Sequence, residues 1–250
     1  GQSYWQILPL GPTSYGDSPY QSFSTFAGNP YFISLEDLIE EGVLTREECA
    51  QADPEVQEDS IDYAKLYEER YPLLRLAYER SDISKNADFV RFCQENDWWL
   101  SDYALFMAVK ARFGGKAWTK WAQDIRLRWG NALDYYRREL YFDIEFHKYL
   151  QFTFFKQWSR LKAYANRQGI RIIGDIPIYV AMDSADAWAN PSLFQLDENN
   201  RPLAVAGCPP DGFSATGQLW GNPLYNWENH RNTGYSWWIS RLAHCYRLYD

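Results

Sequence analysis

The sequence predicts an α/β fold, and two neighbouring stretches carry that prediction. An amphipathic run over residues 131–167 is typical of one long helix or two in line, and Gly169 stands where a helix C-terminus favours glycine. Directly after it, the apolar runs 170–173 and 176–180 flank a Gly-Asp pair and predict buried strand. A helix, a tight turn and a buried strand in this order indicate an α/β sheet.

Local patterns predict the remaining elements in turn. The apolar run 4–10 predicts a buried strand, and the Gly-, Pro- and Ser-rich stretch 11–30 predicts a long loop, a kind of loop that is usually functional. Helices are expected from residue 34 to about 113, with capping-box sequences beginning at Ser34 and Thr45. Residues 183–227 indicate a second loop region, and a final helix is expected over 235–249. The predicted inner face of that helix carries Trp238, Leu242, Cys245 and Tyr249.

Composition excludes several classes of partner. The 250 residues include 33 acidic and 25 basic side chains, a net charge of −8, and no long Lys/Arg run, so nucleic acid and anionic membrane surfaces are poor partners. No apolar stretch is long enough to span a bilayer. Four scattered cysteines without a CxxC pair favour reduced thiols in a cytoplasmic protein over a disulfide frame or a zinc site. No metal or cofactor is expected.

Aromatic residues are the informative excess. They make up 18% of the chain and include 12 tryptophans, more than a core of this size usually needs. Stacking on sugar faces is the leading second use in an acidic, tryptophan-rich protein. Composition alone does not decide between that use and a core rich in aromatic side chains.

Three polar-aromatic stretches lie where an α/β barrel keeps its active site, just after a strand. In the first, over residues 15–21, Asp17 and Gln21 are candidates for hydrogen bonds to sugar hydroxyls, and Tyr15 or Tyr20 is the candidate for a ring face. A turn with Asp17 and Ser18 bonded to their own backbone is the structural alternative. The second is Asp175, for which a buried ion pair is as good an explanation as function. The third, 209–225, interleaves Asp, Gln and Asn with Phe and Trp on a glycine-rich loop that suits a polyhydroxylated ligand or is simply rigid.

Three long segments of the chain closely resemble one enzyme family. They are SYWQILPLGPTSYGDSPYQSFSTFAGNPY, IIGDIPIYVA and CPPDGFSATGQLWGNPLYNWE. These segments are similar to those of the 4-α-glucanotransferases, the amylomaltases or disproportionating enzymes of glycoside hydrolase family seventy-seven. The resemblance implies part of a TIM (β/α)8 barrel with a helical inserted subdomain, acting on α-1,4-glucans and maltooligosaccharides by a retaining double displacement. It assigns residues 1–30 to a barrel strand and substrate loop, 31–130 to the inserted subdomain, and 131–250 to a barrel helix, strand, lid loop and final helix.

The resemblance also implies roles for seven residues, all of them in substrate binding. Asp17, Ser18 and Tyr20 match positions on the donor side of the glucan site, and Asp175 matches a sugar-bonding aspartate that is not the nucleophile. In the lid loop the matching residues are Asp211, Gln218 and Trp220, with Trp220 as a stacking platform. Some relatives carry an aromatic residue at the lid tip, where this chain has Gly212.

The resemblance assigns no catalytic residue to this chain. The family nucleophile is an Asp in an R-x-D-H-F-R-G strand, and residues 1–250 contain no Asp-His pair. Because the chain also begins at Gly1 without an initiator methionine or a leader, we expect an internal piece of the enzyme that is inactive alone and self-associates through open barrel edges. Three alternatives stay open: a non-catalytic carbohydrate-binding module, a glycoside hydrolase that uses Asp17 and Asp175, and a folding remnant without ligand affinity.

Overall fold

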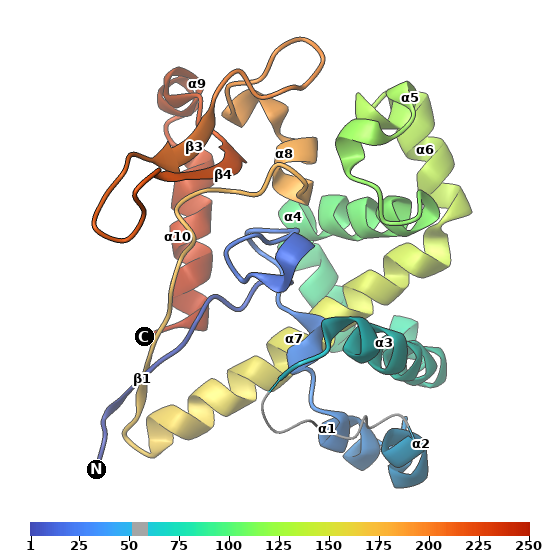
Figure 1. Ribbon diagram of the computed structural model, residues 1–250. Helices are drawn as coiled ribbons and strands as arrows, with labels where there is room; N and C mark the ends of the chain where they lie inside the picture. Colours follow the sequence, from blue (N-terminus) through green and yellow to red (C-terminus); the bar gives the residue numbers. More distant parts are fainter. Residues whose placement is uncertain (52–59) are drawn as a thin grey trace.

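The computed structural model describes residues 1–51 and 60–250 of the chain; residues 52–59, within the predicted helical stretch, lie outside the described part. Figure 1 shows a group of helices around α7, a short parallel strand pair near the N-terminus, and a hairpin beside the last helix, α10. No helix in the described ranges combines the length and the apolar character that a membrane span requires.

The predicted helical stretch folds as expected where it is described. Ser34 accepts a hydrogen bond from the Asp37 amide, and Thr45 and Glu48 bond reciprocally, side chain to amide, at 3.2 and 3.0 Å, which is a complete capping box. The helices of this part are α1 (Leu35–Glu40), α2 (Arg46–Gln51), α3 (Tyr63–Arg80), α4 (Ala87–Arg112) and α5 (Gln123–Arg126). Short 3₁₀ turns lie at Tyr15–Asp17, Pro30–Phe32, Ile83–Lys85, Trp118–Lys120 and Pro191–Leu193.

The predicted run 131–167 is two helices in line, α6 (Gly130–Glu139) and α7 (Tyr141–Arg167). Its predicted apolar stripe is buried along α7, except for Leu161, which is exposed. α7 packs along α4 and contributes to two hydrophobic cores: Ile144 belongs to the one beneath α4, and Leu150 to the one beneath α1 and α3. Gly169 has a φ of 77°, which confirms the predicted glycine at the end of α7.

The strand predictions need two corrections. β1 (Tyr4–Gln6) and β2 (Arg171–Ile173) pair in parallel with Trp5 opposite Ile172, but β1 is exposed rather than buried, with Trp5 at 48% exposure, because it pairs with β2 alone among the described residues. Residues 176–180 form no strand. Pro177 has no amide hydrogen for a ladder, and its carbonyl and that of Ile178 accept side-chain hydrogen bonds instead.

The second predicted loop contains regular structure that its glycines and prolines conceal. It holds α8 (Ala185–Ala189) and an antiparallel hairpin, β3 (Val205–Cys208) and β4 (Gln218–Pro223), followed by α9 (Trp227–Asn232) and α10 (Ser236–Leu248). The predicted inner face of α10 is confirmed in part: Trp238 and Tyr249 pack against the two cores, but Leu242 is 44% exposed. The side chains that α10 buries belong to Arg241, His244 and Leu248.

Candidate functional site

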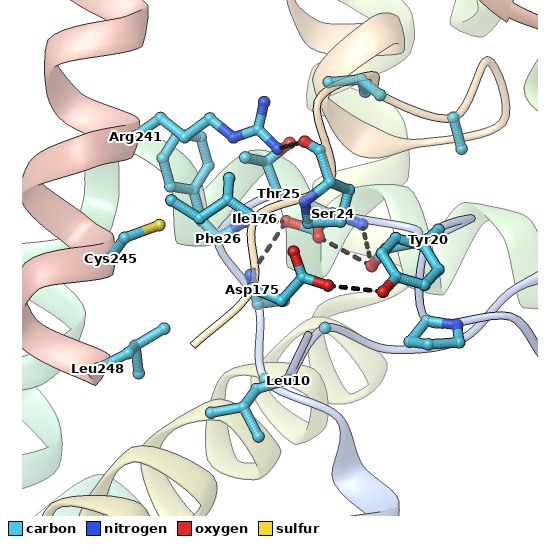
Figure 2. A pocket seen from close by; sticks show the side chains of 18 of the residues that line it. Leu10, Tyr20, Ser24, Thr25, Phe26, Asp175, Ile176, Arg241, Cys245 and Leu248 are labelled. Carbon is cyan, nitrogen blue, oxygen red and sulfur yellow. Dashed lines mark hydrogen bonds between the residues drawn. The ribbon is translucent and has the colours of Figure 1, made fainter. Parts of the chain in front are cut away.

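The first and second polar stretches meet through one hydrogen bond. The Tyr20 hydroxyl donates to Oδ2 of Asp175 over 2.5 Å (Figure 2). This bond, followed by desolvation and the negative charge of Asp175, raises the pKa of the Tyr20 hydroxyl above its ordinary value, because the carboxylate stabilises the protonated phenol. Tyr20 is 45% exposed, so its ring remains accessible beside the carboxylate.

The loop that carries Tyr20 is held by its own backbone and by short polar side chains. Thr13 and Ser22 form an antiparallel bridge, and the Ser14 hydroxyl donates to the Gln21 carbonyl at 2.6 Å. The Ser18 hydroxyl accepts from the Tyr20 amide at 3.3 Å, so Ser18 makes the local turn contact that was the structural alternative for it. Asp17 has a φ of 53°, and its carboxylate is exposed.

Asp175 is the second residue after the end of β2, and it lines a small pocket. Gly174 is the residue that fits before it, because a Cβ there would lie 2.3 Å from the Tyr249 ring. The pocket has a volume of about 50 Å³, too small for a sugar ring, so a saccharide would lie over Tyr20 and Asp175 rather than beneath them. Asp175 is the one carboxylate among the described residues that line it. Retaining glycoside chemistry needs two carboxyl groups about 5–5.5 Å apart, and this arrangement therefore suits binding.

Buried polar side chains hold the segment after Asp175 in place. The Arg241 guanidinium of α10 donates to the Pro177 carbonyl and, over 3.3 Å, to the Tyr225 hydroxyl (Figure 2 shows Arg241). Tyr225 in turn donates to the Ile178 carbonyl at 2.8 Å. Arg241 is buried, so these hydrogen bonds and the Trp237 and Trp238 rings beside its charge replace water around it.

Two amide side chains, those of Gln21 and Asn222, connect the Tyr20 loop to the hairpin. Gln21 donates from Nε2 to Oδ1 of Asn222 at 3.0 Å, and Asn222 donates from Nδ2 to the Val180 carbonyl at 2.9 Å. Gln21 also reaches the Trp220 carbonyl at 3.4 Å. The Gln21 side chain, a candidate for sugar contact in the sequence, therefore serves as a link between the loop, residue 180 and β4.

The hairpin places Trp220 next to the same region. Trp220 is partly exposed, donates from its indole nitrogen to Oε1 of Gln218 at 3.0 Å, and lies 6.2 Å from the Tyr179 ring, centroid to centroid. Tyr179 lines the pocket beneath Asp175. Asp211 lies at the turn of the hairpin, where Oδ1 accepts from the amides of Phe213 and Ser214. Its observed contacts are those of a turn.

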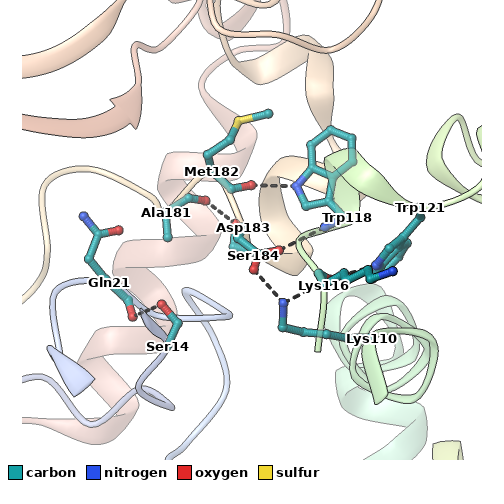
Figure 3. A network of polar contacts seen from close by, with 10 residues as sticks. All are labelled: Ser14, Gln21, Lys110, Lys116, Trp118, Trp121, Ala181, Met182, Asp183 and Ser184. Carbon is teal, nitrogen blue, oxygen red and sulfur yellow. Dashed lines mark hydrogen bonds and ion pairs between the residues drawn. The ribbon is translucent and has the colours of Figure 1, made fainter. Parts of the chain in front are cut away.

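A buried ion pair anchors the chain beyond Val180 to the helical subdomain. Lys110 of α4 lies 2.6 Å from Oδ2 of Asp183, and the Trp118 amide donates to the other carboxylate oxygen at 3.2 Å (Figure 3). The Trp118 indole donates to the Met182 carbonyl at 2.6 Å. The Lys110 ammonium also lies 4.9 Å from the centre of the Phe23 ring, which belongs to the same loop as Tyr20.

The structure brings together part of the predicted set. Tyr20 contacts Asp175 and Gln218 contacts Trp220, while no hydrogen bond among the described residues joins Asp17 or Asp211 to the other candidates. Sequence reasoning missed Arg241 and Tyr179. A charged residue within the apolar pattern of the last helix was the one available signal for Arg241. Asn222 belongs to the stretch 209–225 that the sequence indicated for ligand contact, but its side chain bonds to Gln21 and to the Val180 carbonyl.

Comparisons with known proteins point to one family. The family described as 4-alpha-glucanotransferase matches residues 1–250. A 4-alpha-glucanotransferase of Streptococcus pneumoniae serotype 4 is 51% identical over 251 residues, which cover 100% of this chain and 50% of that protein. A chloroplastic/amyloplastic 4-alpha-glucanotransferase of Arabidopsis thaliana is 39% identical, with 100% of this chain and 44% of that protein covered. The chain thus spans about half the length of the curated relatives it matches.

A solved structure matches the fold closely. It is an amylomaltase from Streptococcus agalactiae in complex with acarbose, with a TM-score of 0.95, 45% sequence identity, and coverage of 100% of this chain and 51% of that one. The described elements are part of a TIM (β/α)8 barrel with a helical inserted subdomain, and they form no closed sheet.

Proposed function

Because this chain belongs to the 4-alpha-glucanotransferase family, we propose that it provides the donor-side glucan-binding surface of a retaining 4-α-glucanotransferase. The substrates are α-1,4-glucans and maltooligosaccharides. The enzyme cleaves a donor glucan, holds the glycosyl group on a carboxylate, and passes it to a sugar 4-hydroxyl in place of water. The observation that carries the proposal is the Tyr20–Asp175 contact, because it sets an exposed ring beside a carboxylate at the end of a barrel strand.

In this proposal the seven candidate residues bind sugar in two groups. Asp17, Ser18, Tyr20 and Asp175 line the donor side. Asp211, Gln218 and Trp220 fold over the glucan from the hairpin, where the indole supplies a stacking face and the amide and carboxylate accept hydroxyl hydrogens. The acarbose complex of the similar amylomaltase supports a saccharide ligand for a site of this kind.

We further propose that the reacting carboxylates lie outside these 250 residues. Asp175 is the one carboxylate among the described residues that line its pocket, and Asp17 does not line it. This disfavours a hydrolase built on these two acids. The helix-rich architecture likewise disfavours an all-β carbohydrate-binding module. The 250-residue chain is then a binding surface without its own chemistry.

The test is glucose release from maltotriose by the purified 250-residue chain and by a longer protein that contains it. We expect activity from the longer protein and none from the chain alone. Turnover by the chain, free of host enzymes, would place the catalytic carboxylates within 1–250. In the longer protein, Asp175→Asn should weaken glucan binding and slow turnover, whereas complete loss of chemistry would favour the hydrolase built on Asp17 and Asp175.

We propose that the chain alone self-associates. β1 and β2 pair only with each other among the described residues, and Tyr4, Trp5 and Ile173 are exposed there. Unpaired strand edges with apolar side chains favour association with a second copy. Size-exclusion chromatography with light scattering should find a dimer or larger species, and a dilute, stable monomer would contradict this.

A further inference from the structure

A second and larger cavity lies on the other side of the Tyr20 loop. It has a volume of about 380 Å³ and opens between α4, α8 and the α9–α10 segment. We call it the Trp98 cavity; it is lined by Trp98, Asp186, Asn190, Ser192, Ser236 and Trp237, among others. Its volume falls within the range of about 300–1,000 Å³ that small-molecule sites occupy, unlike the pocket beneath Asp175.

Residues of the Tyr20 loop form a shared wall between the two pockets. Ser24 and Phe26 line both of them. Between these two residues, the Thr25 amide donates to Oδ2 of Asp186 at 2.7 Å. A molecule in the Trp98 cavity would therefore contact the back of the segment that continues from Tyr20, without touching Tyr20 or Asp175.

Aromatic rings provide the apolar part of the cavity. Trp98 is 51% exposed, and its ring meets Phe26 at 4.7 Å in an edge-to-face arrangement. Trp237 meets the same phenylalanine at 6.1 Å from α10, and Trp99 is buried behind them. An exposed indole supported from beneath is a rigid surface on which the face of a pyranose ring can lie.

Polar side chains lie around these rings. Asn190, Ser192, Ser236 and Ser240 line the cavity, the first three are exposed, and none makes a side-chain hydrogen bond to the protein within residues 1–51 and 60–250. They come from three separate places in the fold: the end of α8, the turn after it, and one face of α10. Hydroxyl and amide groups both donate and accept, which is what sugar hydroxyls require.

The charge of the lining selects against anionic ligands. Its charged side chains are the carboxylates of Asp102 and Asp186, and no Lys, Arg or His is among the described residues that line the cavity. Asp102 is paired with Arg128 at 2.7 Å, and Asp186 is buried and bonded to the Thr25 amide. Phosphorylated ligands would be repelled, and the free hydroxyls suit a neutral one.

We propose that the Trp98 cavity is a second saccharide-binding site, which takes one or two pyranose units of a neutral glucan behind the Tyr20 loop. The class of ligand follows from the lining of the cavity, whereas the choice of an α-1,4-glucan as its occupant rests on the proposed function. One long glucan chain would bind in the Trp98 cavity with one segment and on the Tyr20–Asp175 surface with another. Alternatively, two glucan molecules would occupy the two places separately.

The experiment is a calorimetric titration of the 250-residue chain with maltotriose and with maltoheptaose. The proposed function expects this chain to be inactive, so the ligands are not consumed during the titration. Five proteins are compared: the wild type, Trp98→Ala, Tyr20→Ala, Trp129→Ala and Ser236→Leu. Trp129 is an exposed indole at the start of α6 and lines no described pocket, so its variant controls for the loss of a surface tryptophan. Ser236→Leu is a second variant, which fills the cavity without removing a packed ring.

We expect two classes of site in the wild type and in Trp129→Ala. Trp98→Ala and Ser236→Leu should each weaken one class by about ten-fold or more and leave the other unchanged. Tyr20→Ala should do the reverse. A wild type without a class of site that Trp98→Ala and Ser236→Leu both weaken would overturn the proposal. A wild type that shows this class alone, with no class that depends on Tyr20, would count against the proposed function and leave the Trp98 site standing.

Discussion

The hydroxyl of Tyr20 lies 2.5 Å from Oδ2 of Asp175, and this contact joins two loops that are 155 residues apart in the chain. The carboxylate accepts the phenol hydrogen, so the pair presents a fixed ring and an oriented acid. No hydrogen bond from the described residues reaches Oδ1 of Asp175, which leaves that oxygen for a sugar hydroxyl.

Removing the Tyr20 hydroxyl should weaken the binding of glucans. Tyr20→Phe keeps the ring but frees the Asp175 side chain to rotate, and the loss of a hydrogen bond to a charged group predicts a Kd for maltotriose raised about ten-fold. Calorimetry measures this change. Tyr20→Ala should be weaker still because it also removes the ring. Equal affinities for the wild type and Tyr20→Phe would show that the hydroxyl does not orient the acid.

Trp220 should contribute more to glucan binding than its exposed neighbour Leu219. Both residues lie on β4, but the indole lies beside Tyr179 near Asp175. Loss of a stacking face should cost about 1–2 kcal/mol, so Trp220→Ala should raise the Kd for maltoheptaose by about ten-fold. Leu219→Ala is the matched control, with little change expected. Equal weakening of binding by the two variants would show that the Trp220 indole does not stack on the sugar.

Asn222 should stabilise the fold as well as the site. Asn222→Ala removes the partner of the Val180 carbonyl and of Gln21, and unpaired buried polar groups cost about 1–3 kcal/mol each. Urea unfolding should therefore show a loss in this range. Asn199→Ala, an exposed asparagine whose side chain makes no hydrogen bond within the described residues, should change stability by less than about 0.5 kcal/mol. A loss no larger than that of the control would mean that water replaces these bonds.

Some elements could be predicted from sequence because their signals are local. The Thr45–Glu48 capping box and Gly169 act within a few residues of the helix ends they define, and the structure confirms both. The hairpin β3–β4 was missed for a different reason. Gly207 has no side chain because the Gln218 carbonyl would lie 2.4 Å from a Cβ there, a requirement that only the paired strand reveals.

The candidate site was predicted mainly through the family resemblance. Spacing alone could not bring Tyr20 to Asp175, since the contact forms only when distant loops meet at the end of β2. The sequence did not predict Arg241 as a site residue for a related reason. A charged residue is normally placed on the outer face of a helix, but here the Pro177 carbonyl and the Tyr225 hydroxyl satisfy it inside.

The Lys110–Asp183 ion pair should be strongly coupled. Both groups are largely buried, so Lys110→Met or Asp183→Asn alone leaves one buried charge unpaired and should destabilise the fold by about 3–5 kcal/mol. The double variant leaves neither charge, and its loss should be well below the sum of the two. Chemical unfolding of all four proteins closes the cycle. Strict additivity would mean that the two charges do not stabilise each other.

Stability should fall as the pH is lowered from 7 to 5, mainly because of buried histidines. Burial lowers the pKa of His147 and of His244 to about 4, whereas an unfolded histidine titrates near 6.5. Between these values the unfolded state binds more protons, so each of the two histidines should cost about 2 kcal/mol of stability at pH 5. Burial also lowers the pKa of His230, which adds a contribution of the same sign.

His244→Gln isolates one part of this pH dependence. The ring of His244 lies among Phe26, Trp99 and Phe155, so the variant loses packing at every pH, but its stability should change less between pH 7 and pH 5 than that of the wild type. Urea midpoints at both pH values measure the difference. Glu48, whose pKa its bond to Arg80 lowers to about 2, titrates below this window and does not contribute. An unchanged difference between pH 7 and pH 5 would show that His244 takes up its proton in the folded protein.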